Sequence, residues 1–259
     1  MTRFGLNEKK LAWLCLLLFV TLMPSGVQAS VARLHLFPEQ VEVGAFFQGT
    51  TVRLKGEVPP GSQVVVEILG TPKEQVLLRK GRRAGLWMTV GEIRVEHAPN
   101  LYLVLSSTKE IPSLEGRNAP WGFAALKSRI KFRGALTEPE IDRFFQEFLK
   151  LKESEGLYAA LPGALSLSNE PQGPVKLEGV FPLPPKVAPG TYEVRLSVIQ
   201  NGQVVDQKSH LLTVRLVGFP ALLASLAFEH GAWYGILAVL IAIATGFLMG
   251  FLFKGKAEH

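Results

Sequence analysis

Apolar and polar residues alternate through the first half of the chain. Across residues 33–107, about seven short stretches repeat with the period of two that places every second side chain on a buried face. Turns rich in glycine or proline separate them, for example at 48–49, 59–61 and 99–100. Short strands at this spacing predict an antiparallel β-sandwich of immunoglobulin-like type over residues 30–110.

The period changes to that of a helix in the middle of the chain. Residues 118–132 could form a short helix, and residues 137–158 predict a longer one in which Thr137 and Glu140 make a capping box and Gly156 ends the helix. Its apolar side chains recur at helical spacing, and we expect the stripe to pack on a sheet. The stripe consists of Ile141, Phe144, Phe145, Phe148 and Leu149.

Strand patterns resume in four stretches between residues 163 and 217. Asn201-Gly202 is a strong hairpin signal, and Tyr192 at the entrance of a strand is placed as in a tyrosine corner. We therefore expect residues 111–217 to contain a helical insertion and a second β-rich module. Four strands are few for a complete sandwich, so they could share a sheet with the first module.

A long apolar run, residues 232–253, lies near the end of the chain and contains no charged residue. At about 1.5 Å per residue such a helix crosses a hydrocarbon core of about 30 Å, and a buried helix of a soluble protein is rarely this long. Lys254 and Lys256 follow at once, which by the positive-inside rule marks the cytoplasmic side. We expect 218–231 to be a juxtamembrane linker and 254–259 a cytoplasmic tail.

The first 29 residues have the three parts of a secretory signal. A basic start precedes the apolar run 11–23, and small residues up to Ala29 offer a cleavage site. An uncleaved anchor is the alternative. Cys15, the single cysteine, lies inside this run behind Leu14, which excludes a lipoprotein signal and leaves the mature chain without thiol or disulfide.

The two ends together predict a single-pass protein of a bacterial inner membrane. Its bulk would lie in the periplasm and its C-terminus in the cytoplasm. The fold class predicted is mainly β: an immunoglobulin-like antiparallel β-sandwich region with a helical insertion, plus one C-terminal transmembrane helix. The lipid bilayer is then an obligatory partner.

Charge adds one candidate surface. The chain has 28 basic and 22 acidic residues, and without residues 1–29 the counts are 25 and 21, which is too mild an excess for a polyanion binder. Arg79, Lys80, Arg82 and Arg83 cluster, but an exported segment does not meet nucleic acid. One interpretation is a solvated strand with a turn at Gly81. The other is contact with anionic headgroups, a small anion or an acidic partner.

Motifs for catalysis or metal binding do not occur. The sequence has no nucleophile elbow, phosphate-binding loop or dinucleotide fingerprint, and the carboxylates after Thr137 are expected on a solvated helix face. Four histidines precede the apolar run without metal-ligand spacing, although two of them, His35 and His210, lie in predicted strands and could converge. The others are His97 and His230. We therefore predict no catalytic residue, no cofactor and no metal site.

Small residues recur every four positions in the apolar run. Ala238, Ala242, Gly246 and Gly250 would form one stripe on a helix, which permits close approach of a second helix. The stripe therefore predicts either a membrane-protein partner or self-association. A plain anchor without a partner is the alternative.

Several segments resemble a family of transmembrane proteins first catalogued from alphaproteobacteria. They are "RLHLFPEQVEVGAFFQGTTVRLKGEV", "AGLWM", "EGLY", "FPLPPKVAPGTYEVRL", "NGQVV" and "YGILAVLIAIATGFLMG". The similarity covers nearly the whole chain after the signal, mostly in turn glycines and core aromatics, and the family offers no established activity or catalytic residues to carry over to this chain. The resemblance implies an accessory role at the inner membrane beside a sulfite-exporter-like permease.

The sequence thus favours a non-enzymatic accessory or scaffold for a membrane partner. An assembly factor or chaperone, binding through exposed strand edges, is the second hypothesis. An uncharacterised enzyme is the third, and it would need a closed pocket with convergent polar groups.

Overall fold

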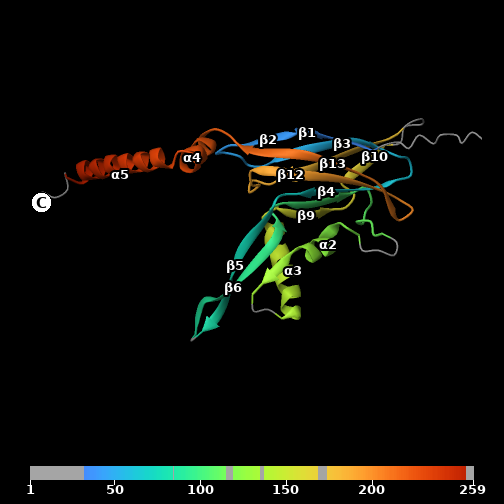
Figure 1. The fold of residues 1–259 in the computed structure, drawn as a ribbon, viewed down its shortest axis with the longest axis horizontal. Coiled ribbons are helices and arrows are strands. Elements are labelled where there is room, and N and C mark those ends of the chain that lie inside the picture. The colour runs from blue at the N-terminus through green and yellow to red at the C-terminus, as the bar shows by residue number, and fades with distance from the viewer. Residues whose placement is uncertain (1–31, 84, 115–118, 135–136, 169–173, 255–259) are drawn as a thin grey trace, which may run out of the picture. The chain divides into compact units, whose positions relative to one another are not determined.

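The computed structural model describes residues 32–83, 85–114, 119–134, 137–168 and 174–254. The predicted signal segment 1–29 lies outside these residues. Figure 1 shows packed β-sheets, an insertion of strands and helices, and the helices that follow the sheets near the C-terminus.

Two sheets form the sandwich. The first contains, in spatial order, β1 (Arg33–Phe37), β3 (Thr50–Val58), β11 (Val175–Leu183) and β10 (Leu165–Ser168). The second contains β2 (Gln40–Val43), β13 (Gln203–Leu216), β12 (Gly190–Gln200), β4 (Gln63–Leu69), β7 (Tyr102–Ser106) and β9 (Tyr158–Leu161). All neighbours are antiparallel except β2 with β13 and β7 with β9, which are parallel.

The strand order confirms the predicted immunoglobulin-like architecture. The first sheet has the order A-B-E-D, and β13-β12-β4-β7 has the order G-F-C-C′ of a variable-type domain. Tyr192 stands at the start of β12 and its hydroxyl donates a hydrogen bond to the Ala188 carbonyl at 2.5 Å, which is a tyrosine corner. Val194, fully buried two residues later, occupies the place of a disulfide cysteine in antibody domains.

Both sheets mix strands from the two halves of the sequence. β3 pairs with β11 over nine residues, and β4 pairs with β12 over seven. Strands from before and after residue 110 therefore share both sheets, which is the alternative that the small number of later strands left open.

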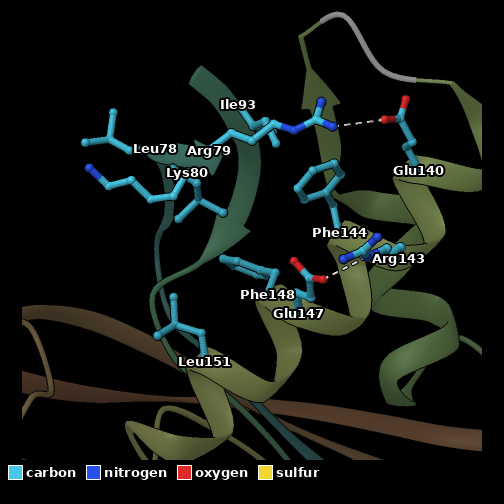
Figure 2. Close-up of a pocket in the computed structure, with 11 residues that line it drawn as sticks. Leu78, Arg79, Lys80, Ile93, Glu140, Arg143, Phe144, Glu147, Phe148 and Leu151 are labelled. Atoms are coloured by element: carbon cyan, nitrogen blue, oxygen red, sulfur yellow. Dashed lines mark hydrogen bonds and ion pairs between the residues drawn. The ribbon is translucent and has the colours of Figure 1, made fainter. Parts of the chain in front are cut away.

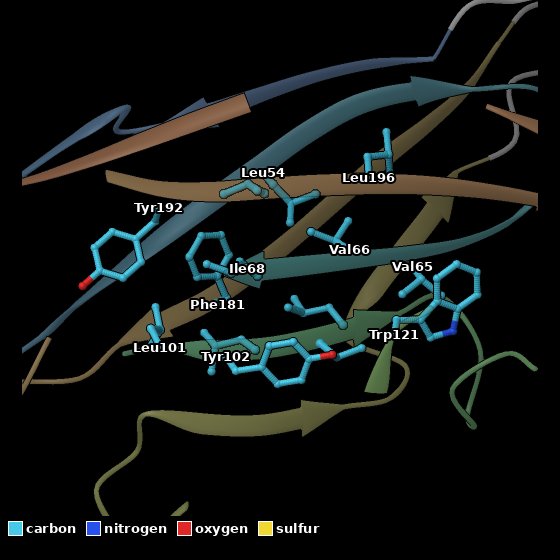
Figure 3. Packing of buried hydrophobic residues seen from close by; sticks show 14 of the residues in the cluster. Leu54, Val65, Val66, Ile68, Leu101, Tyr102, Trp121, Phe181, Tyr192 and Leu196 are labelled. Carbon is cyan, nitrogen blue, oxygen red and sulfur yellow. The ribbon is translucent and has the colours of Figure 1, made fainter. Parts of the chain in front are cut away.

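The core lies between the two sheets (Figure 3). Leu54 and Phe181 from the first sheet face Val66, Ile68 and Leu196 from the second, and all five side chains are fully buried. Strand β4 is buried on its other face as well, which explains its nearly continuous apolar run.

An insertion covers that other face. It comprises β5 (Pro72–Arg83), β6 (Leu86–Pro99), β8 (Lys131–Arg133), α2 (Gly122–Arg129) and α3 (Glu138–Ser154), and we call it the insertion lobe. The sequence places the β5 and β6 segments in the sandwich, but they form a separate three-stranded sheet in the order β5-β6-β8. Alternation alone does not determine which sheet a strand joins.

Helix α3 forms as its sequence predicts. The Glu140 carboxylate accepts hydrogen bonds from the Thr137 backbone N–H at 2.9 Å and from its hydroxyl at 3.0 Å, and Gly156 follows the helix with φ +71°. The rings of Phe145 and Phe148 are buried, and Phe148 packs edge-on against Tyr158 of β9 with centroids 5.8 Å apart. The apolar stripe thus fastens the insertion lobe to the second sheet.

Two helices follow β13. Helix α4 (Phe219–Phe228) occupies the predicted linker, and α5 (Gly231–Lys254) occupies the predicted membrane span. Within the described residues, Gly231–Phe253 is the one helix long and apolar enough to cross a membrane, with mean hydropathy 2.6 and no part of its most apolar window buried. A mainly β fold with a helical insertion and one C-terminal apolar helix is therefore confirmed.

Candidate binding groove and membrane helix

A groove of about 460 Å³ lies between the β5–β6 hairpin and α3 (Figure 2). Leu78 and Ile93 line it from the hairpin, and Phe144, Phe148 and Leu151 line it from the helix. Ile93 and Phe148 are buried at its floor, whereas the side chains of Leu78 and Leu151 are 53% and 44% exposed. The groove therefore offers accessible apolar surface.

Charged pairs border this groove. Arg79 lies 3.5 Å from the Glu140 carboxylate, and its guanidinium is 5.7 Å from the centre of the Phe144 ring. Arg143 donates to Glu147 at 3.0 Å along the helix. Hydrogen bonds from the Thr137 backbone and hydroxyl lower the pKa of Glu140, and Arg79 adds to this effect. The rim of the groove therefore carries both positive and negative side chains.

The other cations of the predicted basic cluster lie further along the hairpin. Lys80 Nζ donates to the Thr89 hydroxyl at 2.9 Å, and Arg82 Nε donates to the Gly85 carbonyl at 3.3 Å. The predicted turn at Gly81 is wrong, because Gly81 pairs with Met88 inside the β5–β6 ladder. The chain reverses around Gly85, whose φ of +84° suits a turn.

The end of the hairpin exposes three apolar side chains, which belong to the family-like segment "AGLWM" but were not predicted as a candidate site. Leu86 is 66% exposed, Trp87 74% and Met88 42%. The signal was present in the sequence as three large apolar residues directly after a turn glycine. We call Lys80, Arg82, Arg83 and Leu86–Met88 together the hairpin tip.

A second group of cations is used within the fold. Lys127 lies 2.6 Å from Asp142, and Arg133 lies 2.6 Å from Glu96. These pairs join α2 to α3 and β8 to β6. Several carboxylates that the sequence places on a solvated helix face therefore form ion pairs within the insertion lobe. Each exposed ion pair contributes little to the free energy of unfolding.

A buried carboxylate lies between the sandwich and α2. Glu67 of β4 is 2% exposed, and the Tyr102 hydroxyl donates to it at 2.7 Å while accepting from the Gly122 backbone N–H at 2.8 Å. Arg129 is 3.8 Å away and also donates to the Pro120 carbonyl. Burial raises the pKa of Glu67, against the hydrogen bond from Tyr102 and the charge of Arg129, which lower it.

This cluster is a structural anchor by its contacts. A hollow of about 500 Å³ beside it includes His97, Arg129 and Glu193 in its lining. Glu193 accepts hydrogen bonds from Arg195 and Ser209, and Arg129 has the partners given above. The charged groups of Arg129 and Glu193 thus each bond to residues outside the hollow, and the contacts of Arg129 help to hold α2 against the sheet.

The histidines do not form a metal centre within the described part of the chain, where no three His, Cys, Asp or Glu side chains converge. His35 borders a hollow with Lys208 and Ser209, and His210 Nε2 lies 3.3 Å from Glu39. His97 adopts φ +61° near the C-terminal end of β6. The backbone carbonyl of His230 accepts a hydrogen bond from the Tyr234 N–H near the start of α5.

The small-residue stripe of α5 is exposed along its described length. Ala238, Ala242, Gly246 and Gly250 all lie on exposed helix, and a Cβ added at either glycine would meet no atom within 4 Å. Ile243, Phe247 and Phe251 flank the two glycines and line a shallow hollow with them. Such a surface has room for a neighbouring helix.

Comparisons with known proteins give a family and little more. No curated protein sequence matches the chain. Among solved structures, murine CRIg aligns with 72% of this chain and 98% of its own at 12% identity and a TM-score of 0.24, which is too low to support an argument. Residues 33–255 match the family described as "Putative transmembrane protein (Alph_Pro_TM)". This range runs from β1 past the end of α5, and the chain therefore belongs to that family of transmembrane proteins.

Proposed function

We propose that the protein is a non-enzymatic accessory or scaffold, anchored in a bacterial inner membrane by α5, whose sandwich and insertion lobe bind a membrane-protein partner in the periplasm. A permease of the sulfite-exporter-like type is the partner that the family resemblance favours. The C-terminus lies in the cytoplasm in this proposal, because Lys254 and Lys256 follow the span.

The groove between the hairpin and α3 is the observation that carries the proposal. Its apolar side chains remain accessible at Leu78 and Leu151 although the same helix buries Phe145 and Phe148 in the fold. An apolar centre with a polar rim is the composition of a protein-binding surface. The rim pairs Arg79–Glu140 and Arg143–Glu147 supply polar groups of both signs around it.

The anchor strengthens binding without adding contacts to the groove. A domain held by α5 and a partner in the same bilayer meet at a high effective concentration, so a small groove suffices. The stripe at Gly246 and Gly250 offers a second contact inside the membrane, where close packing drives association.

Photocrosslinking tests the groove. A crosslinking amino acid is placed at Leu78 or Leu151, and at Val180 of β11, which is 49% exposed, as the control. We expect the same single protein to be crosslinked at positions 78 and 151, in a fixed amount relative to this chain. We expect no such adduct at position 180. Equal labelling from all three positions, or no protein adduct at 78 and 151, would contradict the proposal.

Charge substitution gives the matched binding test. Leu78→Glu and Val180→Glu both place a carboxylate on an exposed strand position, so neither disturbs the core. We expect Leu78→Glu to reduce recovery of the partner in mild detergent about tenfold or more, as for a central interface residue. Val180→Glu should leave recovery unchanged.

An assembly factor is the second candidate, and one observation favours it. On the side away from β12, β13 pairs with a described strand only at Thr213–Leu216, through β2. The backbone of Gln203–Leu212 is therefore unpaired there among the described strands, although β1 lies near it and the Ala32 N–H donates to Asp206. Such an edge can accept a strand of another chain. Crosslinks from Val205 to changing partners that disappear as a complex matures would favour this role over a permanent scaffold.

A further inference from the structure

The hairpin tip combines an apolar edge with a basic edge. In the last ladder pairs of the hairpin, Arg82 lies opposite Trp87 and Arg83 lies opposite Leu86. Paired residues share a face of the sheet, so each face of the tip presents a cation beside an apolar side chain. Trp87 is the most exposed residue of the three apolar ones, at 74%.

The positive charge of the tip is not neutralised by the described residues. Lys80, Arg82 and Arg83 are exposed and make no ion pair within the described part of the chain, in contrast to Arg79, which pairs with Glu140. No acidic residue occurs between Arg79 and Gly91. An anionic surface therefore gains charge contacts at the tip without having to displace an internal carboxylate.

The hairpin is long enough to act as an arm. Strand β5 has 12 residues, which at about 3.3 Å per residue extend roughly 35–40 Å from Pro72 to the tip. β8 pairs with β6 only at Arg94–Glu96, close to its base, so the described strands leave the outer part of the hairpin as a two-stranded ribbon. An exposed tryptophan with flanking cations on such an arm has the composition of a membrane-interface contact.

We propose that the hairpin tip inserts Leu86, Trp87 and Met88 into the interfacial region of the same bilayer that α5 spans, with Lys80, Arg82 and Arg83 on anionic lipid headgroups. The occupant is lipid because α5 already holds the chain at a bilayer, so the tip pays no cost of bringing domain and membrane together. Burial of apolar side chains and attraction of basic residues to anionic lipids add to one another in interfacial binding. The domain would then have two attachments, which fixes its orientation over the membrane.

This inference goes beyond partner binding and is tested without a partner. The full chain with Cys15→Ser and Met88→Cys carries an environment-sensitive fluorophore at 88 and is reconstituted in nanodiscs of phosphatidylcholine with phosphatidylglycerol. The matched control carries the label at Val180→Cys, which is similarly exposed on β11. We expect nitroxide-bearing lipids to quench the label at 88 and aqueous iodide to quench the label at 180.

Two variants separate the contributions. Replacing Lys80, Arg82 and Arg83 with serine should lower the ratio of inserted to free tip roughly fivefold for each cation, and nanodiscs of phosphatidylcholine alone should have the same effect on the parent. Trp87→Ser should lower the ratio in both lipid compositions. All these residues are exposed, so an unchanged far-ultraviolet dichroism spectrum controls for folding.

The proposal is overturned if iodide quenches the label at 88 as well as at 180 in discs that contain phosphatidylglycerol. It is also overturned if a photocrosslinker at 88 in native membranes reacts with a protein and not with lipid. Loss of the partner from the groove variant Leu78→Glu leaves the lipid result unchanged, so the two proposals fail separately.

Discussion

Removing one hydroxyl tests how the insertion lobe is fastened to the sandwich. Tyr102→Phe keeps the buried ring and deletes the donor to Glu67 at 2.7 Å and the acceptor of the Gly122 N–H at 2.8 Å. A hydrogen bond to a buried charged group contributes about 1.5–3 kcal/mol, and a neutral one about 0.5–1.5 kcal/mol. We therefore expect the free energy of unfolding to fall by about 2–4 kcal/mol.

A second tyrosine provides the control. Tyr158 is equally buried, and its hydroxyl donates at 2.7 Å to a neutral acceptor, the Pro99 carbonyl. Tyr158→Phe should therefore cost only about 1 kcal/mol. The difference between the two variants isolates the contribution of the Glu67 charge from that of losing any buried hydroxyl.

Urea unfolding of the full chain in detergent provides the assay. Near-ultraviolet dichroism follows Trp121, which is buried and bonded to the Pro112 carbonyl at 2.7 Å. Glu67→Gln removes the charge, and in that background Tyr102→Phe should cost about 1–2 kcal/mol less than alone. Equal costs for the two tyrosines, or a coupling within about 0.3 kcal/mol of zero, would refute this account of the anchor.

Three further predictions concern Glu67, the apolar stripe of α3 and the membrane helix. Because burial raises the pKa of Glu67, its folded form binds more protons than its unfolded form between 4.5 and that raised pKa. As the pH rises from below 4.5 towards neutrality, the free energy of unfolding in urea should therefore fall for the unsubstituted protein relative to Glu67→Gln. Phe148→Ala opens a cavity between α3 and Tyr158 and should cost about 3–5 kcal/mol in the same assay, with Leu151→Ala, an exposed position on α3, as the control. Gly246→Leu should abolish a helix-packed complex on native gels, whereas Leu240→Ala should not, and an intact complex would indicate a plain anchor.

Features specified by local chemistry were predictable from the sequence. Asn201 and Gly202 adopt positive φ at the predicted hairpin, because few other residues tolerate that conformation. Thr137 and Glu140 begin α3 as predicted, since their spacing alone allows the reciprocal cap. The span α5 follows from length and composition without any knowledge of tertiary contacts.

Features specified by distant contacts were not predictable. From the sequence alone, either Gly81 or Gly85 could form the turn of the hairpin. The register of β5 with β6 places Gly81 within a strand and Gly85 where the chain turns back. The groove depends on α3 meeting a hairpin some sixty residues earlier in the chain, as Arg79 and Glu140 show. Glu67 is a different case, because a single carboxylate within the apolar run of β4 could have indicated a buried, paired charge.

Topology is the most direct test of the central claim, which is that α5 holds the folded domain in the periplasm. Two single-cysteine variants in a Cys15→Ser background, Lys208→Cys on β13 and Lys256→Cys in the tail, are exposed to a membrane-impermeant maleimide in spheroplasts. The account predicts labelling at 208 in intact spheroplasts and labelling at 256 only after permeabilisation. Labelling at 256 with protection at 208 would contradict it.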